Sequence, residues 1–220
     1  GEAPWALVEE LAGEGEEVAC LPWQGGEPPR AAWEDLLEAL DPGRAQSPEE
    51  AVAGLERARC LCALRQGPAG VEGLNALLAA ALGRPRLHAH GSPVLVTRNA
   101  YGLGVHNGDM GVLWAEGERL RACFPREQGL LRLPLGELPA HEPAYALTVH
   151  KSQGSEYERV LLVLPPEPHP LVTRELLYTA LTRARRQVRI LASPASWEAG
   201  VARPTRRTSG LAWRLERAQG

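Results

Sequence analysis

Residues 146–157 read Ala-Leu-Thr-Val-His-Lys-Ser-Gln-Gly-Ser-Glu-Tyr, a segment that starts apolar and turns polar after Val149. Lys151 in this segment is the single lysine of the chain, and the other basic residues among the 24 are arginines. A chain so rich in Arg, Ala, Gly and Pro indicates a bias against lysine codons, so a lone lysine here indicates a functional position. A second polar segment follows at 174–186, Arg-Glu-Leu-Leu-Tyr-Thr-Ala-Leu-Thr-Arg-Ala-Arg-Arg.

Strand-like and helix-like segments alternate around both of these stretches. Apolar, β-leaning runs predict strands at 17–23, 59–65, 144–150, 159–164 and 188–192. Helical patterns cover 31–40, 71–82 and 174–185, and Ser47 followed by Pro48 and Glu50 predicts a capped helix start. A strand, a glycine-rich turn (67–70) and a helix form the βα unit of a parallel sheet. We therefore expect an α/β domain built on a parallel sheet.

Residues 86–140 have a different character. Short β-leaning runs at 92–98, 108–114, 119–124 and 129–135 are separated by turns at 10–12-residue spacing. Evenly spaced short strands are typical of a small antiparallel barrel. We expect this segment to be inserted into the α/β domain, which then consists of residues 1–85 and 141–220.

Length and composition bound the class of protein. A chain of 220 residues that is 44% hydrophobic and 23% charged can bury one core and a small second one. No apolar run is long enough to span a membrane, the start lacks the anatomy of a signal peptide, and a start without Met is typical of a piece of a longer protein. Cys20, Cys60, Cys62 and Cys123 lack metal-binding spacing, so we expect buried thiols in a reducing cytoplasm and no metal site.

The net charge of −3 conceals an asymmetry. Residues 1–60 contain 14 acidic and 4 basic residues, whereas residues 171–220 contain 10 arginines and 3 acidic residues. A basic end can contact phosphate groups while an acidic end faces a partner. The alternative is that the acidic stretch is simply a solvated surface, and the sequence leaves both open.

The two polar segments resemble motifs V and VI of superfamily 1 helicases. Their sequences most resemble those of the RecD family, the alpha subunit of exodeoxyribonuclease V. The resemblance is dense over 60–75, 91–114 and 144–192, extends to the tail at 205–211, and is faint over 1–56. It implies that the parallel sheet is the second RecA-like motor domain of a helicase. It also implies that the insertion is a β-barrel of the Src-homology-3 type.

The residues that hold ATP and Mg²⁺ in such motors are missing from the sequence. It contains no Gly-x-x-x-x-Gly-Lys loop, and no Asp-Glu pair follows an apolar strand. The resemblance places both features in the first motor domain, outside this chain. We therefore expect an enzyme only in the full-length protein, with the isolated chain inactive and without a bound cofactor.

The resemblance implies roles at the nucleotide for four residues. Arg183 matches the motif VI arginine finger, and Arg65 matches the motif IV arginine, so both are predicted to be catalytic. A guanidinium suits this role because its planar fork bonds two phosphate oxygens and stays charged. Gly154 and Glu156 match motif V residues that approach the nucleotide. The alternative for either arginine is a surface ion pair.

A further set of residues is implied at single-stranded DNA. Four of them follow a predicted strand end, where short polar side chains and a cation can follow phosphate groups: Thr148, His150, Lys151 and Ser152. Tyr101 and His106, in the insertion, are predicted to stack on bases. The alternatives are a buried structural role for His150 and packing of a turn by the two insertion residues.

We therefore expect the C-terminal motor domain of a RecD-type, ATP-dependent 5′-to-3′ DNA helicase subunit acting in double-strand-break repair and recombination. The polarity comes from the resemblance alone. Expected partners are single-stranded DNA, the first motor domain and the RecB and RecC subunits, with no membrane. Two alternatives remain: a stand-alone RecD-like or Pif1-like helicase module, and a non-catalytic, helicase-shaped scaffold in a nucleic-acid complex. Absence of an intact Walker A loop upstream in the parent gene would favour the scaffold.

Overall fold

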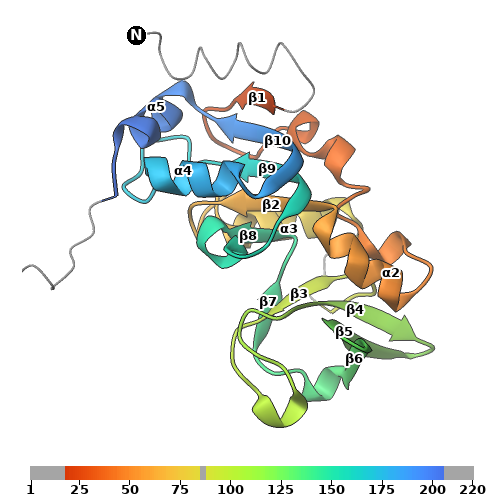
Figure 1. Ribbon diagram of the computed structural model, residues 1–220. Coiled ribbons are helices and arrows are strands. Elements are labelled where there is room, and N and C mark those ends of the chain that lie inside the picture. Colours follow the sequence, from red (N-terminus) through yellow and green to blue (C-terminus); the bar gives the residue numbers. More distant parts are fainter. Residues whose placement is uncertain (1–17, 85–87, 206–220) are drawn as a thin grey trace, which may run out of the picture.

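The computed structural model describes residues 18–84 and 88–205, which form two sheets joined through β7 (Figure 1). The larger sheet has five strands in the order β1-β10-β9-β2-β8, and all of its pairs are parallel. Its strands are β1 (Val18–Pro22), β10 (Ala184–Ala192), β9 (Tyr157–Val163), β2 (Ala58–Cys62) and β8 (Ala146–Thr148). The expected α/β domain on a parallel sheet is confirmed.

Helices cover both faces of this sheet. On one face, α3 (Val71–Ala81) packs Leu74 and Leu78 into a core that includes Leu161 and Val163 of β9. On the other face, α4 (Arg174–Leu181) and α5 (Pro194–Ala202) close a second core that includes Val160 and Leu162. Successive side chains of a strand point to opposite faces, so a strand covered on both sides reads as a continuous apolar run. This is why 159–164 is so apolar in the sequence.

The second sheet, called the smaller sheet below, is antiparallel and also has five strands, in the order β6-β5-β4-β3-β7. Its strands are β3 (Pro93–Val96), β4 (Met110–Glu116), β5 (Arg119–Arg126), β6 (Gly129–Pro134) and β7 (His141–Pro143). The expected antiparallel insertion is confirmed. Within the described ranges no pairing joins β6 to β7, so the strand pairing alone does not establish the expected small barrel.

Gly111 shows how closely the strands of this sheet pack. A Cβ atom on Gly111 would lie 2.6 Å from the Cys123 carbonyl oxygen and 2.7 Å from the Phe124 ring. Such distances leave no room for a side chain, so β4 requires glycine where it lies beside Cys123 and Phe124 of β5.

Helix α2 (Pro48–Ala53) attaches the insertion to the parallel-sheet domain. Val52 of α2 and Leu55 of the following 3-10 turn η4 (Gly54–Glu56) share a buried cluster with Val112 and Cys123 of the smaller sheet. The predicted cap is confirmed, because the Ser47 hydroxyl accepts a hydrogen bond from the Glu50 amide at 3.1 Å. The Glu50 carboxylate accepts from the Gln46 amide at 2.9 Å, one residue before the position expected for a capping box.

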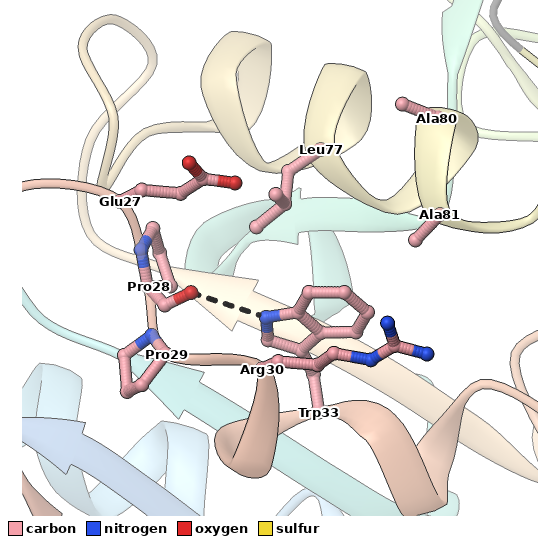
Figure 2. A pocket seen from close by; sticks show the side chains of 8 residues that line it. All are labelled: Glu27, Pro28, Pro29, Arg30, Trp33, Leu77, Ala80 and Ala81. Carbon is pink, nitrogen blue, oxygen red and sulfur yellow. Dashed lines mark hydrogen bonds between the residues drawn. The ribbon is translucent and has the colours of Figure 1, made fainter.

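The helix predicted over 31–40 is wrong. Two 3-10 turns, η1 (Arg30–Ala32) and η2 (Glu34–Leu36), replace it, because Trp33 between them has φ −138° and ψ −8°, outside the helical region. The buried Trp33 indole donates to the Pro28 carbonyl at 3.4 Å. Figure 2 shows its ring between the Pro28–Arg30 segment and α3, beside a pocket of about 510 Å³. Burial of this ring outweighs the helical pattern of the sequence.

Two predicted boundaries around the polar segments 146–157 and 174–186 are also wrong. The strand expected over 144–150 ends at Thr148, and a 3-10 turn, η7 (Val149–Ser152), follows. The helix expected over 174–185 ends at Leu181, and β10 already begins at Ala184. Pairing with β9 explains the second change, because the Tyr157 amide donates to the Arg183 carbonyl at 2.8 Å. The basic residues Arg185 and Arg186 therefore lie on a strand.

Candidate functional site

The 3-10 turn η7 uses its hydroxyl groups internally. Thr148 Oγ1 accepts from the Lys151 amide at 3.3 Å, and Ser152 Oγ donates to the Val149 carbonyl at 2.8 Å. Thr148 and Ser152 are both buried, whereas His150 is exposed. The turn thus presents the side chains of His150 and Lys151 and keeps the two hydroxyls for its own backbone. The structural alternative for His150, a buried side chain, is contradicted.

Beyond η7 the chain turns at Gly154. This glycine has φ +86°, a left-handed conformation that strongly favours glycine, and nothing lies within 4 Å of the Cβ it lacks. Its lack of a side chain leaves open surface next to Glu156. The Glu156 carboxylate is 54% exposed and pairs with Arg185 at 3.0 Å. A ligand that approaches Gly154 therefore meets backbone and a carboxylate.

Arg183 lies just beyond the C-terminal end of α4, against the same loop. Its guanidinium donates to three neutral oxygens: Thr179 O at 3.1 Å, Ser155 O at 3.0 Å and Thr182 Oγ1 at 3.3 Å. The salt bridges among the described residues include no carboxylate for Arg183. The side chain is therefore positioned while its charge is left uncompensated, which contradicts the surface ion pair considered as the alternative.

Arg65 and Lys151 share one carboxylate. Lys151 Nζ lies 2.5 Å from Glu142 Oε1, and Arg65 Nη2 lies 3.2 Å from Glu142 Oε2. Glu142 lies on β7, and Arg65 follows β2 before the start of α3. The ion pair considered as the alternative for Arg65 is thus present. Arg65 and Arg183 form no hydrogen bond with each other: Arg65 contacts Glu142, and Arg183 contacts the Ser155 carbonyl.

Tyr101 and His106 form a separate exposed pair at the β3–β4 connection of the insertion. Their ring centroids are 5.6 Å apart in an edge-on arrangement, and Tyr101 is 74% exposed. Asn99 donates to the Tyr101 hydroxyl at 2.9 Å and also accepts from the Asn107 amide at 2.7 Å. These contacts hold the tip of the connection while leaving one aromatic ring in solvent.

Two pockets border candidate residues of the site, and only the larger of the two touches η7. The larger, of about 870 Å³, lies between η7 and α4, and its lining includes His150, Gln153, Leu171, Glu175 and Arg203. Hydrogen bonds from Thr205 hold the pKa of Glu175 below its usual value. The smaller, of about 480 Å³, is lined by Arg65, Glu142 and the outer face of α3. Arg65 thus borders the smaller pocket, and His150 borders the larger one.

Arg59 was not identified from the sequence, yet it connects several parts of the site. This arginine of β2 is only 2% exposed. Its guanidinium donates to the Ala144 carbonyl and to the Leu55 carbonyl at 2.6 Å, and it lies 5.2 Å from the centre of the Tyr157 ring. Arg59 thereby connects the short segment between β7 and β8 with Tyr157, the first residue of β9. Glu142 was missed as well, because only the tertiary fold brings it to two distant cations.

Metal-binding clusters are absent from the described part of the chain: no group of three or more His, Cys, Asp or Glu side chains there could hold an ion. Cys60, Cys62 and Cys123 are buried and none of the four cysteines forms a disulfide, so the prediction of buried thiols is confirmed for these three. Cys20 is half-buried. No helix in residues 18–84 and 88–205 is both long and apolar enough to span a membrane.

Comparison with known proteins shows what part of this arrangement is similar to. Residues 143–191, which contain η7, Gly154, Glu156 and Arg183, match the UvrD-like helicase C-terminal domain. Among solved structures, the Pif1 helicase from Bacteroides in complex with ADP-AlF3 and ssDNA covers 84% of this chain and 50% of its own, with 17% identity and a TM-score of 0.44.

Curated relatives make the assignment more specific. The RecBCD enzyme subunit RecD of Mycobacterium tuberculosis is 46% identical over 172 residues, which are 76% of this chain and 30% of that protein. The ATP-dependent RecD2 DNA helicase of Deinococcus radiodurans is 39% identical over 152 residues, which are 65% of this chain and 21% of that protein. The chain belongs to the RecD family and spans 30% of the length of the first of these relatives and 21% of the second.

Proposed function

We propose that this chain is the second motor domain of a RecD-type, ATP-dependent DNA helicase. The observation that carries the proposal is Arg183, whose guanidinium is held by three neutral oxygens and has no carboxylate partner among the described residues. An oriented, uncompensated guanidinium suits the stabilisation of charge that develops on a transferred γ-phosphoryl group. It would act across a cleft on ATP bound mainly by the first motor domain.

The other nucleotide residues have complementary roles in this proposal. Gly154 leaves space for the nucleotide to approach the backbone, and the exposed Glu156 offers a carboxylate to the ribose hydroxyls. Arg65 supplies a second positive charge once it leaves Glu142. The Mg²⁺ ligands are assigned to the first motor domain, and Mg²⁺ would supply charge neutralisation on the phosphates.

Single-stranded DNA would pass along the surface formed by His150 and Lys151. Both side chains reach solvent, as phosphate contacts require. Thr148 and Ser152 are reassigned to holding the turn, so any DNA contact there would involve the backbone. Tyr101, with His106 beside it, is proposed to stack on a base beyond the parallel sheet.

The remaining expectations concern the whole protein. We propose that residues 86–140 form the inserted Src-homology-3-type unit between 1–85 and 141–220, although β7 (His141–Pro143) pairs within the smaller sheet. We also propose 5′-to-3′ translocation, a role in double-strand-break repair and cytoplasmic RecB and RecC partners. The uncompensated Arg183 favours a motor over a scaffold.

Arg183→Ala in the full-length protein tests the proposal. ATP hydrolysis should fall by about 10³–10⁵-fold, the contribution of an inserted arginine in phosphoryl transfer, while single-stranded DNA affinity stays unchanged. Steady-state ATP turnover and fluorescence anisotropy with a labelled oligonucleotide measure the two effects. Arg119→Ala, which removes an exposed arginine of β5 distant from these motifs, is the charge-matched control. Parental turnover in Arg183→Ala would refute the finger assignment.

A further inference from the structure

We propose that Glu142 is a positioning residue that couples Arg65 to Lys151, so that a ligand held by one cation changes the availability of the other. This inference rests on the proposed function, which assigns Arg65 to the nucleotide phosphates and Lys151 to DNA. It adds a residue that lies outside all of the helicase-like motifs and belongs to the smaller sheet.

The geometry divides one carboxylate between two cations. Each oxygen of Glu142 faces one of them, at 2.5 Å for Lys151 Nζ and 3.2 Å for Arg65 Nη2. The Glu142 side chain is 17% exposed, whereas Lys151 is 30% and Arg65 59% exposed. The ion pairs among the described residues give neither cation a second carboxylate. The shared anion is thus the most buried of the three groups, and both cations can be reached from solvent.

The charges predict an antagonism between the two ligands. One negative charge compensates two positive ones, so an anion that draws Arg65 away leaves both oxygens of Glu142 to Lys151. Lys151 is then held more tightly and is less available to a DNA phosphate. By linkage, a phosphate that holds Lys151 leaves Glu142 to Arg65 and weakens the nucleotide contact by the same factor.

The position of Glu142 in the fold extends this coupling to the insertion. Glu142 pairs with Leu95 of β3 in the smaller sheet, and β8 of the parallel sheet begins only four residues later. Arg65 and Lys151 both belong to the parallel-sheet domain. A shift of the insertion on bound DNA would therefore move the carboxylate relative to both cations.

Glu142→Gln in the full-length protein removes the charge and keeps the shape. We expect single-stranded DNA to bind about two- to fivefold more tightly, the size that partly exposed ion pairs usually have. The gain should be larger with a non-hydrolysable ATP analogue than without it, and the log–log salt slope should steepen by about 0.7 because Lys151 is released. Dissociation constants for an oligo(dT) probe, with and without the analogue at several salt concentrations, give all three values.

Glu72→Gln is the matched control, because Glu72 lines the same pocket and has no ion pair among the described residues. It should leave the DNA affinity and the salt slope at parental values. Glu142→Gln behaving like Glu72→Gln would overturn the coupling.

A second cycle tests the direction of the coupling through Arg65. Arg65→Gln should weaken DNA binding about two- to fivefold in the parental background, because Glu142 then holds Lys151 alone, and should have no effect in a Lys151→Gln background. This cycle needs no change at Glu142 and remains available if Glu142→Gln fails to fold. Equal weakening in both backgrounds would overturn the coupling, because Arg65 would then act directly on DNA.

The single variant Lys151→Gln separates this inference from the proposed function. If it weakens DNA binding while Glu142→Gln has no effect, the coupling is wrong and the DNA path stands. If it leaves DNA binding unchanged, the DNA path assigned to Lys151 is wrong, and the coupling falls with it.

Discussion

Cys62 shows how burial controls chemistry at the scale of one residue. It lies at the end of β2, fully buried, and its thiol contacts the Leu64 carbonyl at 3.3 Å and the Leu147 carbonyl at 3.6 Å. Burial raises the pKa of Cys62 to about 12, because a thiolate would lose its hydration. Burial likewise raises the pKa of Cys123 to about 11. Both side chains therefore act as small apolar groups at neutral pH.

The raised pKa predicts a pH dependence of stability. The unfolded thiol titrates near pH ~8.5, so above that pH the unfolded chain loses a proton that folded Cys62 keeps, and the free energy of unfolding falls until about pH 12. The stabilising effect is complete below pH ~8.5. Between pH ~9 and ~11, Cys62→Ala should remove up to about 1.4 kcal/mol per pH unit of this decline, measured by urea unfolding. Parallel declines in parent and variant would contradict the assignment.

At the scale of one element, α2 depends on the residue that caps its N-terminus. The helix has only six residues, so its own hydrogen bonds stabilise it weakly, and the Ser47 cap and the cluster with Val112 and Cys123 fix it in place. Because α2 packs against the smaller sheet, the cap also supports the attachment of the insertion.

Replacement of Ser47 tests this dependence. Ser47→Ala should lower the free energy of unfolding by about 1 kcal/mol, because the Glu50 amide loses its acceptor, whereas Ser47→Asp should keep most of the stability. Urea denaturation of the two variants gives the comparison. A Ser47→Ala variant as stable as the parent would show that the hydroxyl contributes nothing.

At the scale of the whole molecule, ion pairs join the acidic N-terminal segment to the basic C-terminal segment. Arg189 of β10 pairs with Asp35, with 2.7 Å between Nη2 and Oδ2, and this hydrogen bond holds the pKa of Asp35 below its usual value. Arg185 pairs with Glu56 at 3.2 Å. Part of the charge asymmetry is thus neutralised within the fold, and only the remainder is available to a partner.

The proposed division of the motor between two domains predicts the behaviour of the isolated chain. The purified 220-residue chain should fold cooperatively and show no DNA-stimulated ATP turnover, because half of a cleft cannot position the attacking water. Circular dichroism melting and a coupled ATPase assay measure the two properties, with the full-length protein as the positive control. Turnover that survives further purification and disappears in Arg183→Ala would refute the split of the site between two domains.

The sequence alone determined the elements whose patterns are local or nearly so. The apolar run over 159–164 predicts a strand, Ser47 predicts a helix cap, and the evenly spaced turns predict an antiparallel insertion. All three are present. The segment around Lys151 also identified the family before any geometry was known, because motif residues follow one another along the chain.

Only the tertiary structure decided what distant residues do to one another. Burial of Trp33 replaced a predicted helix by two 3-10 turns, and pairing with β9 ended α4 before Arg183. The placement of Glu142 between Arg65 and Lys151 joins residues 77 and 9 positions away along the chain. No local sequence pattern predicts this pair of contacts. The fold brings the three charged groups together, and their burial sets the strength of the ion pairs.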